Sequence, residues 1–350
     1  TVLSRGLGDV YKRQEKLMLR AISNANFYKF TAKPNPVVGA ILVKGEEIIS
    51  EGYHEKFGQN HAEINAINLA KKKINKNFND FSELVLICTL EPCSHIGKTG
   101  SCAHAIVNSG IKKVIIGSID PNPLVSGKGV KILEDGGIKV EKNLCAELVR
   151  KQNKYFFFKQ TFKRPYLTVK IASSSDGKSH YKDSERTYIT SDASRNDVQI
   201  LRAEHDGILT GGNTLRNDNP QMNARVNFDT NQPQKILLSN QDINEDKYEF
   251  FKNNSANIHS NQSLDEVIEF YKNSDLCSIL IEAGPDLVNA FLKTGKVDEI
   301  VIYTSNKVLG DEGVDWFKEK NAIENYGFKL ESSYKIGGDV KETFIKNEKK

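Results

Sequence analysis

A histidine, a glutamate and two cysteines in the first third of the chain have the types and spacing of a catalytic metal site. His61 and Glu63 form the segment "HAE", and Cys93 and Cys102 bracket the loop "CSHIGKTGSC". Imidazole and thiolate groups are ligands of zinc, and a catalytic zinc keeps three protein ligands and one position for water. We therefore predict that His61, Cys93 and Cys102 bind zinc. Glu63 would then carry a proton from zinc-activated water to a leaving amine.

The cysteine count favours metal binding over disulfides. Five cysteines is an odd number, and a chain of 350 residues is unlike a small secreted disulfide scaffold. We expect a reducing, cytoplasmic location, where a close cysteine pair more often binds metal. The net charge of +4, with lysines spread along the chain, is weak evidence for nucleic-acid binding. No apolar run approaches the roughly 18 residues that a membrane span needs.

The elements that must position these residues alternate between helix and strand. Apolar residues have helical spacing in residues 15–26 and in "HAEINAINLAKKK", whereas "ELVLICTL" is a continuous apolar run typical of a strand covered on both faces. Cys93 follows that strand, and Cys102 opens the next predicted helix. Helix N-termini stabilise thiolates through their exposed N–H groups. The alternation predicts a layered α/β domain.

A change in composition divides the chain. The segment "LVRKQNKYFFFKQTFKRP" is basic and aromatic, and we interpret it as an interdomain helix rather than a nucleic-acid surface. The predicted domains are residues 15–160 and 161–350. Residues 1–14 lack periodicity, and we interpret them as a non-native or disordered extension. After Pro165 strand and helix patterns alternate again, with Ser191 or Asp192 as a helix N-cap, which predicts a second α/β domain.

The motifs of the first half resemble those of the bifunctional riboflavin-biosynthesis family, in which a pyrimidine deaminase is fused to a reductase. The loop "PCSHIGKTGSC" fits that family's P-C-S-H-x-G-[RK]-T-x-x-C pattern, and "KPNPVVGAILV", "GYHEKFGQNHAE" and "DPNPLVSGKG" fit further motifs. Zinc base deaminases in general carry H-x-E with a shorter P-C-x-x-C spacing. The resemblance implies a cytidine-deaminase-like three-layer fold. It also implies a substrate pocket formed by Asn35, His54, His95, Lys98, Thr99 and Asn122.

The second half lacks a G-x-G-x-x-G motif after a strand, so a Rossmann dinucleotide site is unsupported. Instead, "RPYLTVKIASSSDG", "LRAEHDGILTGGNTLRNDNPQMNAR" and "IEAGPDLV" resemble the reductase of the same family, which has a dihydrofolate-reductase-like α/β fold and uses NADPH. The resemblance implies that Lys170 and Asp218 are catalytic. The implied substrate contacts are Arg186, Arg202, Met222, Arg225 and Glu282. The implied cofactor contacts are Ala172, Ser174, Tyr188, Thr190, Thr214, Asp218, Ser239, Gly284 and Pro285.

The resemblance implies two consecutive reactions on one phosphorylated pyrimidine. The first is zinc-dependent hydrolytic deamination of 2,5-diamino-6-(5-phosphoribosylamino)pyrimidin-4-one. The second is NADPH-dependent reduction of the ribosyl group to a ribityl chain, giving 5-amino-6-(5-phosphoribitylamino)uracil. It further implies a homodimer joined through the second domain, with neither nucleic acid nor membrane as a partner.

Two alternative interpretations remain open from the residues. One is a single-activity zinc deaminase, acting on a nucleoside or nucleic acid, whose second domain is inactive; Arg186 and Ala283 depart from the reductase pattern of the family. The other is a non-enzymatic zinc-binding module. A structural zinc site is closed by four protein ligands, and His95 is the candidate for the fourth.

Overall fold

Alternating apolar side chains on neighbouring strands build the sheet of the first half of the chain. In β1 (Gly39–Lys44), Ala40 and Leu42 belong to one buried cluster, whereas Ile41 and Val43 belong to another. Successive side chains of a strand point to opposite faces, so both faces of this sheet are covered. The strand order is β2-β1-β3-β4-β5, with β2 and β3 antiparallel to β1 and the β3–β4 and β4–β5 pairs parallel.

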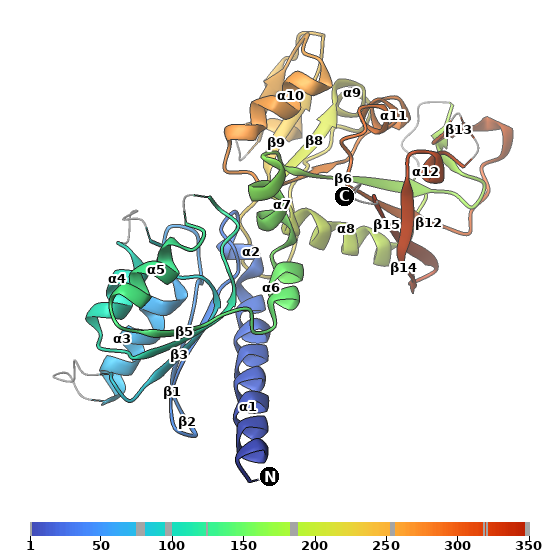
Figure 1. The fold of residues 1–350 in the computed structure, drawn as a ribbon. Helices are drawn as coiled ribbons and strands as arrows, with labels where there is room; N and C mark the ends of the chain where they lie inside the picture. The colour runs from blue at the N-terminus through green and yellow to red at the C-terminus, as the bar shows by residue number, and fades with distance from the viewer. Residues whose placement is uncertain are drawn as a thin grey trace. The chain divides into compact units, whose positions relative to one another are not determined.

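The structure, a computed structural model, describes residues 2–74, 81–94, 100–123, 125–182, 188–252, 256–317, 319 and 321–346. It divides into two units, Thr1–Phe162 (unit 1) and Lys163–Lys350 (unit 2) (Figure 1). The remaining strands of unit 1 are β2 (Glu47–Tyr53), β3 (Val85–Leu90), β4 (Lys113–Ser118) and β5 (Lys139–Glu141). Its helices are α1 (Val2–Ala25), α2 (Lys29–Ala32), α3 (Ala62–Ile74), α4 (Cys102–Asn108), α5 (Lys128–Asp135), α6 (Ala146–Gln152) and α7 (Lys154–Phe162).

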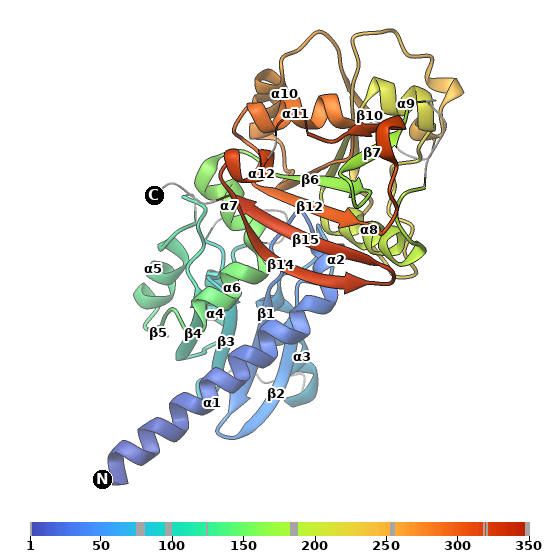
Figure 2. The same ribbon diagram turned by 90° about the vertical axis from the view of Figure 1, so that its right-hand side faces the viewer.

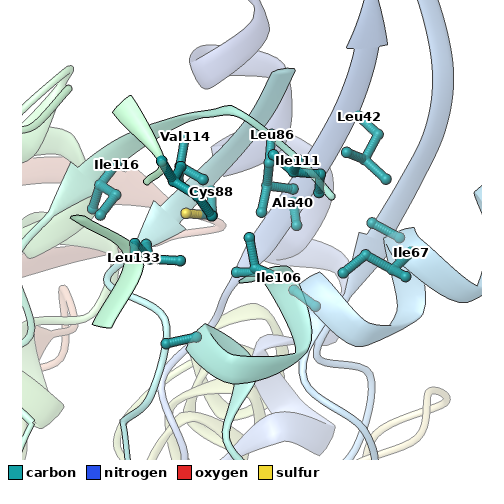
Figure 3. Close-up of a cluster of buried hydrophobic side chains, with 14 of the residues drawn as sticks. Ala40, Leu42, Ile67, Leu86, Cys88, Ile106, Ile111, Val114, Ile116 and Leu133 are labelled. Carbon is teal, nitrogen blue, oxygen red and sulfur yellow. The ribbon is translucent and has the colours of Figure 1, made fainter. Parts of the chain in front are cut away.

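Unit 1 has three layers. Helices α3, α4 and α5 cover one face of the sheet, and Figure 3 shows Ile67, Ile106 and Leu133 from these helices against the strand residues Leu86 and Val114. Helix α1 packs on the opposite face. Gly52 in β2 lets α3 approach closely, because a Cβ there would lie 2.2 Å from the backbone nitrogen of Ala66. This contact fixes the helix whose N-terminus carries Glu63.

Unit 2 is built on an eight-stranded sheet with the order β10-β9-β8-β11-β6-β12-β15-β14. The first six strands are parallel, and β15 and β14 form an antiparallel hairpin beside β12 (Figure 2). Its strands are β6 (Tyr166–Ser173), β8 (Gly207–Gly211), β9 (Gln234–Leu238), β10 (Ala256–His259), β11 (Ser278–Ile281), β12 (Glu299–Thr304), β14 (Phe328–Ile336) and β15 (Asp339–Lys346). A separate two-stranded sheet pairs β7 (Lys178–Tyr181) with β13 (Gly313–Asp315).

Helices cover both faces of the sheet of unit 2. They are α8 (Asp192–Glu204), α9 (Gly212–Asp218), α10 (Leu264–Phe270), α11 (Pro285–Lys293) and α12 (Ala322–Asn325). Helices α10 and α11 pack against one buried cluster, and α8 and α9 against the other. In open parallel sheets, ligands bind outside the carboxyl ends of the strands. The segments after β8, β9 and β11 are therefore the places to look for a site.

The structure differs from two of the predicted helices and confirms the predicted N-cap of a third. Helix α1 begins at Val2 rather than at Glu15, so helical conformation extends into the predicted extension. The basic-aromatic segment forms two helices, α6 and α7, and Phe156 and Phe157 pack against the core of unit 1. Ser191 is the N-cap of α8, where its hydroxyl accepts the N–H of Ser194. In the described part of the chain, no helix is long and apolar enough to cross a membrane.

Candidate active sites

The three predicted zinc ligands of unit 1 converge. The Nδ1 atom of His61 lies 3.2 Å from the sulfur of Cys102 and 3.6 Å from the sulfur of Cys93. All three donor atoms lie within 4.8 Å of one another. Zn–N bonds of about 2.0 Å and Zn–S bonds of about 2.3 Å in tetrahedral geometry place such atoms about 3.6 Å apart. The donor set and its spacing therefore fit a zinc ion.

The start of α4 holds the two cysteines in register. The backbone N–H of Cys102 donates to the sulfur of Cys93 at 3.3 Å, and the hydroxyl of Ser101, the N-cap, donates to the carbonyl of Cys93 at 3.0 Å. Hydrogen bonding from Cys102 lowers the pKa of the Cys93 thiol, whereas the same bond and burial raise the pKa of Cys102. Cys93 and Cys102 would hold a divalent cation as thiolates, because its charge would stabilise both sulfurs in the deprotonated form.

Glu63 lies in the first turn of α3, buried beside this ligand set. Its side chain hydrogen-bonds Cys102, and the residue is 3% exposed. Burial raises the pKa of Glu63 to about 7, with the charge of His61 acting in the opposite direction. A carboxyl group with a pKa near the working pH can both accept and donate a proton. Glu63 therefore has the position and the acidity of a proton carrier.

Asn35 and His54 lie beside the zinc ligands, but only Asn35 can readily face a ligand. The Nε2 atom of His54 lies 3.1 Å from the amide nitrogen of Asn35, and its Nδ1 atom lies 3.1 Å from the carbonyl of Asn60. Nε2 must therefore accept and Nδ1 donate, which describes a neutral ring, and burial lowers the pKa of His54. His54 is 2% exposed, so we interpret it as the residue that orients Asn35.

The other predicted pocket residues of unit 1 are placed as follows. Asn122 is half-buried in the loop after β4, and its N–H donates to the Asp120 carboxylate at 2.8 Å. His95, Lys98 and Thr99 lie outside the described residues. Their assignment to the substrate pocket, and that of His95 as a fourth ligand, stay predictions.

Unit 2 contains a cavity of about 1120 Å³ at the carboxyl ends of its parallel strands. Small-molecule pockets are commonly about 300–1,000 Å³, so this cavity has room for two ligands side by side. The sequence-predicted residues that line it are Lys170, Ala172, Tyr188, Thr190, Arg202, Thr214, Asp218, Met222, Arg225, Ser239, Glu282, Gly284 and Pro285. Residues from all three quoted motifs of the second half, together with Tyr188, Thr190 and Ser239, thus meet at one site.

A buried carboxylate joins two cations in the wall of this cavity. Both oxygens of Glu282 accept from the guanidinium of Arg202, at 2.6 and 3.0 Å, and the ammonium of Lys170 lies 3.1 Å away. Burial alone would raise the pKa of Glu282, but the charges of Arg202 and Lys170 outweigh it and lower that pKa to about 2. The group therefore stays ionised and holds both cations at the cavity, where they can meet an anionic or carbonyl-bearing ligand.

Among the described residues, one predicted site residue of unit 2 does not line the cavity. Ser174 lies outside the lining, and its hydroxyl donates to Asp176 at 2.6 Å and accepts the N–H of Lys178 at 2.9 Å. This hydroxyl stabilises the turn between β6 and β7, so the assignment of Ser174 as a cofactor contact has no counterpart in the cavity. Arg186 lies outside the described residues, and its role stays a prediction.

Comparison with known proteins links both sites to one family. Residues 11–118 match the family described as the cytidine and deoxycytidylate deaminase zinc-binding region, and residues 165–341 match the RibD C-terminal domain. The chain is 35% identical over 344 residues to the riboflavin biosynthesis protein RibD of Aquifex aeolicus (strain VF5), covering 89% of this chain and 95% of that one. The chain belongs to the RibD family.

Solved structures agree with this membership of the RibD family. An Acinetobacter baumannii RibD structure superposes with a TM-score of 0.86 at 32% identity, covering 96% of this chain and 99% of that one. A Thermotoga maritima diaminohydroxyphosphoribosylaminopyrimidine deaminase/5-amino-6-(5-phosphoribosylamino)uracil reductase gives 0.83 at 30% identity with the same coverage. The predicted fold class, a cytidine-deaminase-like domain followed by a dihydrofolate-reductase-like domain, is confirmed.

Family membership also confirms the predicted cofactors, zinc and NADPH. The residues of unit 2 suit a dinucleotide. Gly284 is the N-cap of α11, and Pro285 occupies its first turn. Apart from Gly284 and its two neighbours, no described residue has a heavy atom within 4 Å of the place where a Cβ of Gly284 would be. The exposed N–H groups of a helix start favour phosphate, so this open turn fits a pyrophosphate.

Sequence reasoning missed Glu91, a buried residue that connects backbone segments beside the predicted deaminase site. Its buried carboxylate accepts the backbone N–H groups of Asp120, Gly127 and Val130, at 3.2, 3.0 and 3.1 Å. It thereby joins the end of β3 to the loop that carries Asn122 and to the start of α5. The residue stands two positions before Cys93, between the quoted strand run and the quoted loop, and no local pattern distinguishes it from a solvated glutamate.

Sequence reasoning also missed Asn153, between α6 and α7. Its side-chain oxygen accepts the N–H of Val37 at 2.7 Å, and its amide nitrogen donates to the carbonyl of Val37 at 3.0 Å and to that of Val149 at 3.3 Å. The side-chain amide of Asn153 thus pairs with both backbone groups of Val37, as a neighbouring β-strand would. Val37 lies two positions after Asn35 in the chain. We infer that Asn153 positions the loop on which Asn35 lies.

Replacing Asn153 with alanine is expected to destabilise unit 1 by about 2 kcal/mol, because it leaves a buried N–H and a buried carbonyl of Val37 without partners. The KM for the pyrimidine should rise more than kcat falls, and zinc content should be unchanged. Denaturant unfolding, metal analysis and kinetics check this. The exposed Asn108 at the end of α4 supplies the control, Asn108→Ala. Equal effects of the two substitutions would contradict the positioning role.

Proposed function

We propose that this chain catalyses two consecutive steps of riboflavin biosynthesis. Unit 1 hydrolyses the 2-amino group of 2,5-diamino-6-(5-phosphoribosylamino)pyrimidin-4-one, releasing ammonia. Unit 2 then reduces the ribosyl group with NADPH to give 5-amino-6-(5-phosphoribitylamino)uracil. The observation that carries the proposal is the presence, on one chain, of a zinc-ligand set beside a buried glutamate and of a large cavity with a Lys–Glu–Arg cluster. An unrelated base deaminase would leave unit 2 unexplained.

In the deamination, His61, Cys93 and Cys102 would hold zinc, which supplies an acidified water as nucleophile. Glu63 accepts the proton of that water and delivers it toward the departing nitrogen, so that one water is consumed and one ammonia leaves. Asn35, held by His54, offers an amide group that can pair with the edge of the pyrimidine ring. Because burial lowers the pKa of His54, its ring stays neutral and adds no positive charge beside the zinc site.

In the reduction, NADPH supplies a hydride to the anomeric carbon of the ribose. The C–O bond of the sugar ring opens, and the ring oxygen gains a proton and becomes a hydroxyl. In this proposal Lys170 delivers that proton, which is supported by its ion pair with Glu282 and by a side chain that is 18% exposed. Arg225 also lines the cavity and can meet the 5′-phosphate of the substrate. Asp218 lines the same cavity and stays a catalytic candidate.

We also propose that the protein works in the cytoplasm and as a homodimer joined through unit 2. All five cysteines lie in the described part of the chain, and no disulfide joins any two of them, which suits a reducing compartment. Strand β14 is the edge of the eight-stranded sheet, and most of its side chains are exposed, which supports a subunit contact at this edge.

A two-stage assay tests the proposed function. Zinc-loaded protein is given the diaminopyrimidinone ribosyl phosphate and ammonia is measured; NADPH is then added and its absorbance followed. We expect both signals in sequence. A zinc chelator should abolish ammonia release, whereas NADPH oxidation with the deaminated intermediate should continue, because the metal ligands lie in unit 1. Ammonia without NADPH oxidation would support the inactive-reductase alternative. Zinc-loaded protein that releases no ammonia would exclude the proposal.

A further inference from the structure

Arg216 in α9 has a buried donor that no residue in the described part of the chain satisfies. Its Nη2 atom donates to the side-chain oxygen of Asn213 at 2.6 Å, but its Nη1 atom is buried without a hydrogen-bond partner. Leaving a buried donor unsatisfied costs roughly 1–3 kcal/mol, and more when the group is charged. Such groups are rare in native proteins and call for an explanation. Because Arg216 lines the cavity of unit 2, the missing partner can be a ligand.

The surroundings of this donor are those of an anion site. A Cβ built on Gly212 would lie 2.7 Å from the hydroxyl of Ser239 and 3.1 Å from Nη1 of Arg216. Glycine therefore allows the Ser239 hydroxyl and the Arg216 guanidinium to lie close together against the start of α9. The Ser239 hydroxyl now donates to the carbonyl of Gln241 at 2.9 Å, and its proton can rotate toward a ligand. Guanidinium and hydroxyl donors together match a phosphate group.

The strand order indicates which phosphate would lie there. Ser239 follows β9, and Lys170 lies on β6, with β8 and β11 between them. Three strand spacings amount to about 14 Å. The proposed hydride transfer lies at Lys170, and the open turn at Gly284, after β11, suits the pyrophosphate. Ser239 and Arg216 therefore lie beyond the pyrophosphate, on the side away from the reacting carbon.

The group that a nicotinamide dinucleotide places there is its adenosine. We propose that Arg216, together with Ser239, binds the 2′-phosphate of NADPH and sets the preference for NADPH over NADH. This inference rests on the proposed reductase function of unit 2. It assigns to Arg216 a role that neither the quoted motifs nor the family resemblance supplied.

Calorimetric titration of the full chain tests this assignment by binding alone. The probes are NADP⁺ and NAD⁺, and the fragments adenosine 2′,5′-bisphosphate and adenosine 5′-diphosphate. Arg216→Gln should weaken NADP⁺ and the bisphosphate by about 10- to 100-fold and change NAD⁺ and the diphosphate by less than about twofold, as expected for a lost charge-assisted hydrogen bond. Arg216→Lys should lose less affinity for NADP⁺ than Arg216→Gln, because lysine keeps the positive charge although it lacks the planar guanidinium.

Arg195→Gln is the matched control. Arg195 also lines the cavity, but its guanidinium already donates to the Thr190 carbonyl and the Asp192 carboxylate. Its removal takes one positive charge from the same cavity and should leave the ratio of NADP⁺ to NAD⁺ affinity unchanged. An unchanged ratio in Arg216→Gln would overturn the assignment, as would a rise confined to the KM of the phosphorylated pyrimidine. If the wild-type chain binds neither dinucleotide, the reductase proposal itself fails.

Discussion

Glu63→Gln is expected to reduce the rate of ammonia release by about 10³-fold, because general acid–base catalysis by one side chain contributes on that order. Glutamine keeps the shape of the side chain but has no carboxylate to accept the proton of the attacking water. The zinc ligands His61, Cys93 and Cys102 are untouched, so one zinc per chain should remain. Initial rates of ammonia release, together with metal analysis, measure both quantities.

Two controls separate this loss from general damage. Glu55→Gln changes an exposed glutamate of the same unit and should leave ammonia release unchanged. The Glu63→Gln variant should also oxidise NADPH at the wild-type rate when it is given the deaminated intermediate, because that chemistry lies in unit 2. A Glu63→Gln protein that binds zinc and retains more than about a tenth of its activity would show that another group carries the proton.

The zinc site could be predicted from the sequence because its ligands stand at element boundaries. His61 immediately precedes α3, Cys93 comes soon after β3, and Cys102 is the first residue of α4. The continuous apolar run of β3 and the helical spacing of α3 are strong local patterns. Since β2 and β3 are both antiparallel to β1, they run in the same direction, and the segments after them, which carry His61 and the two cysteines, meet at one edge of the sheet.

Residues that act through distant partners could not be predicted in this way. Asn153 pairs with Val37 across 116 positions, and Glu91 holds Gly127 across 36. The sequence around a polar residue in a helix or loop is the same whether its side chain is solvated or is hydrogen-bonded to backbone groups far away in the chain. His54 shows a further limit of the local pattern, because its motif predicts a ligand contact but does not reveal that both ring nitrogens have partners within the protein.

Short elements were missed for a related reason. Helix α9 has seven residues, contains Gly212 and ends in asparagine and aspartate, which are weak helix formers. Strand β10 has four residues. Both are formed because their apolar residues, such as Leu215, pack into the core of unit 2. Tertiary packing thus decides their conformation, and no repeat of apolar residues is long enough to predict it.

Glu282→Gln is expected to cost unit 2 about 3–5 kcal/mol of stability, because it leaves the buried Arg202 and the half-buried Lys170 without their counter-charge. NADPH oxidation should fall with it, since Lys170 loses the carboxylate that holds it at the cavity. Trp316 is the only tryptophan of the chain and is buried in unit 2, where its indole N–H donates to the Ala172 carbonyl at 2.8 Å. Its fluorescence therefore reports the unfolding of this unit alone.

The pH dependence of this stability provides a second readout. The pKa of Glu282 is lowered to about 2 in the folded chain from an ordinary value of 4.5. Its contribution is therefore fully present above pH 4.5 and is lost as the pH falls toward 2, by on the order of 3 kcal/mol. The Glu282→Gln variant should lack this part of the acid transition. Denaturant titrations between pH 3 and pH 7, followed by Trp316 fluorescence, measure it.

The surface pair Glu269–Lys272 gives the matched control for the cluster. Glu269 lies 2.9 Å from the ammonium of Lys272, and the side chain of Glu269 is 69% exposed. Glu269→Gln should therefore cost less than about 0.5 kcal/mol of stability at any pH. The contrast between the two glutamates isolates the effect of burial, because both are ion-paired. If Glu282→Gln were as mild as Glu269→Gln, the cations at the cavity would be held by something other than this carboxylate. The assignment of Lys170 as the proton donor would then lose its structural basis.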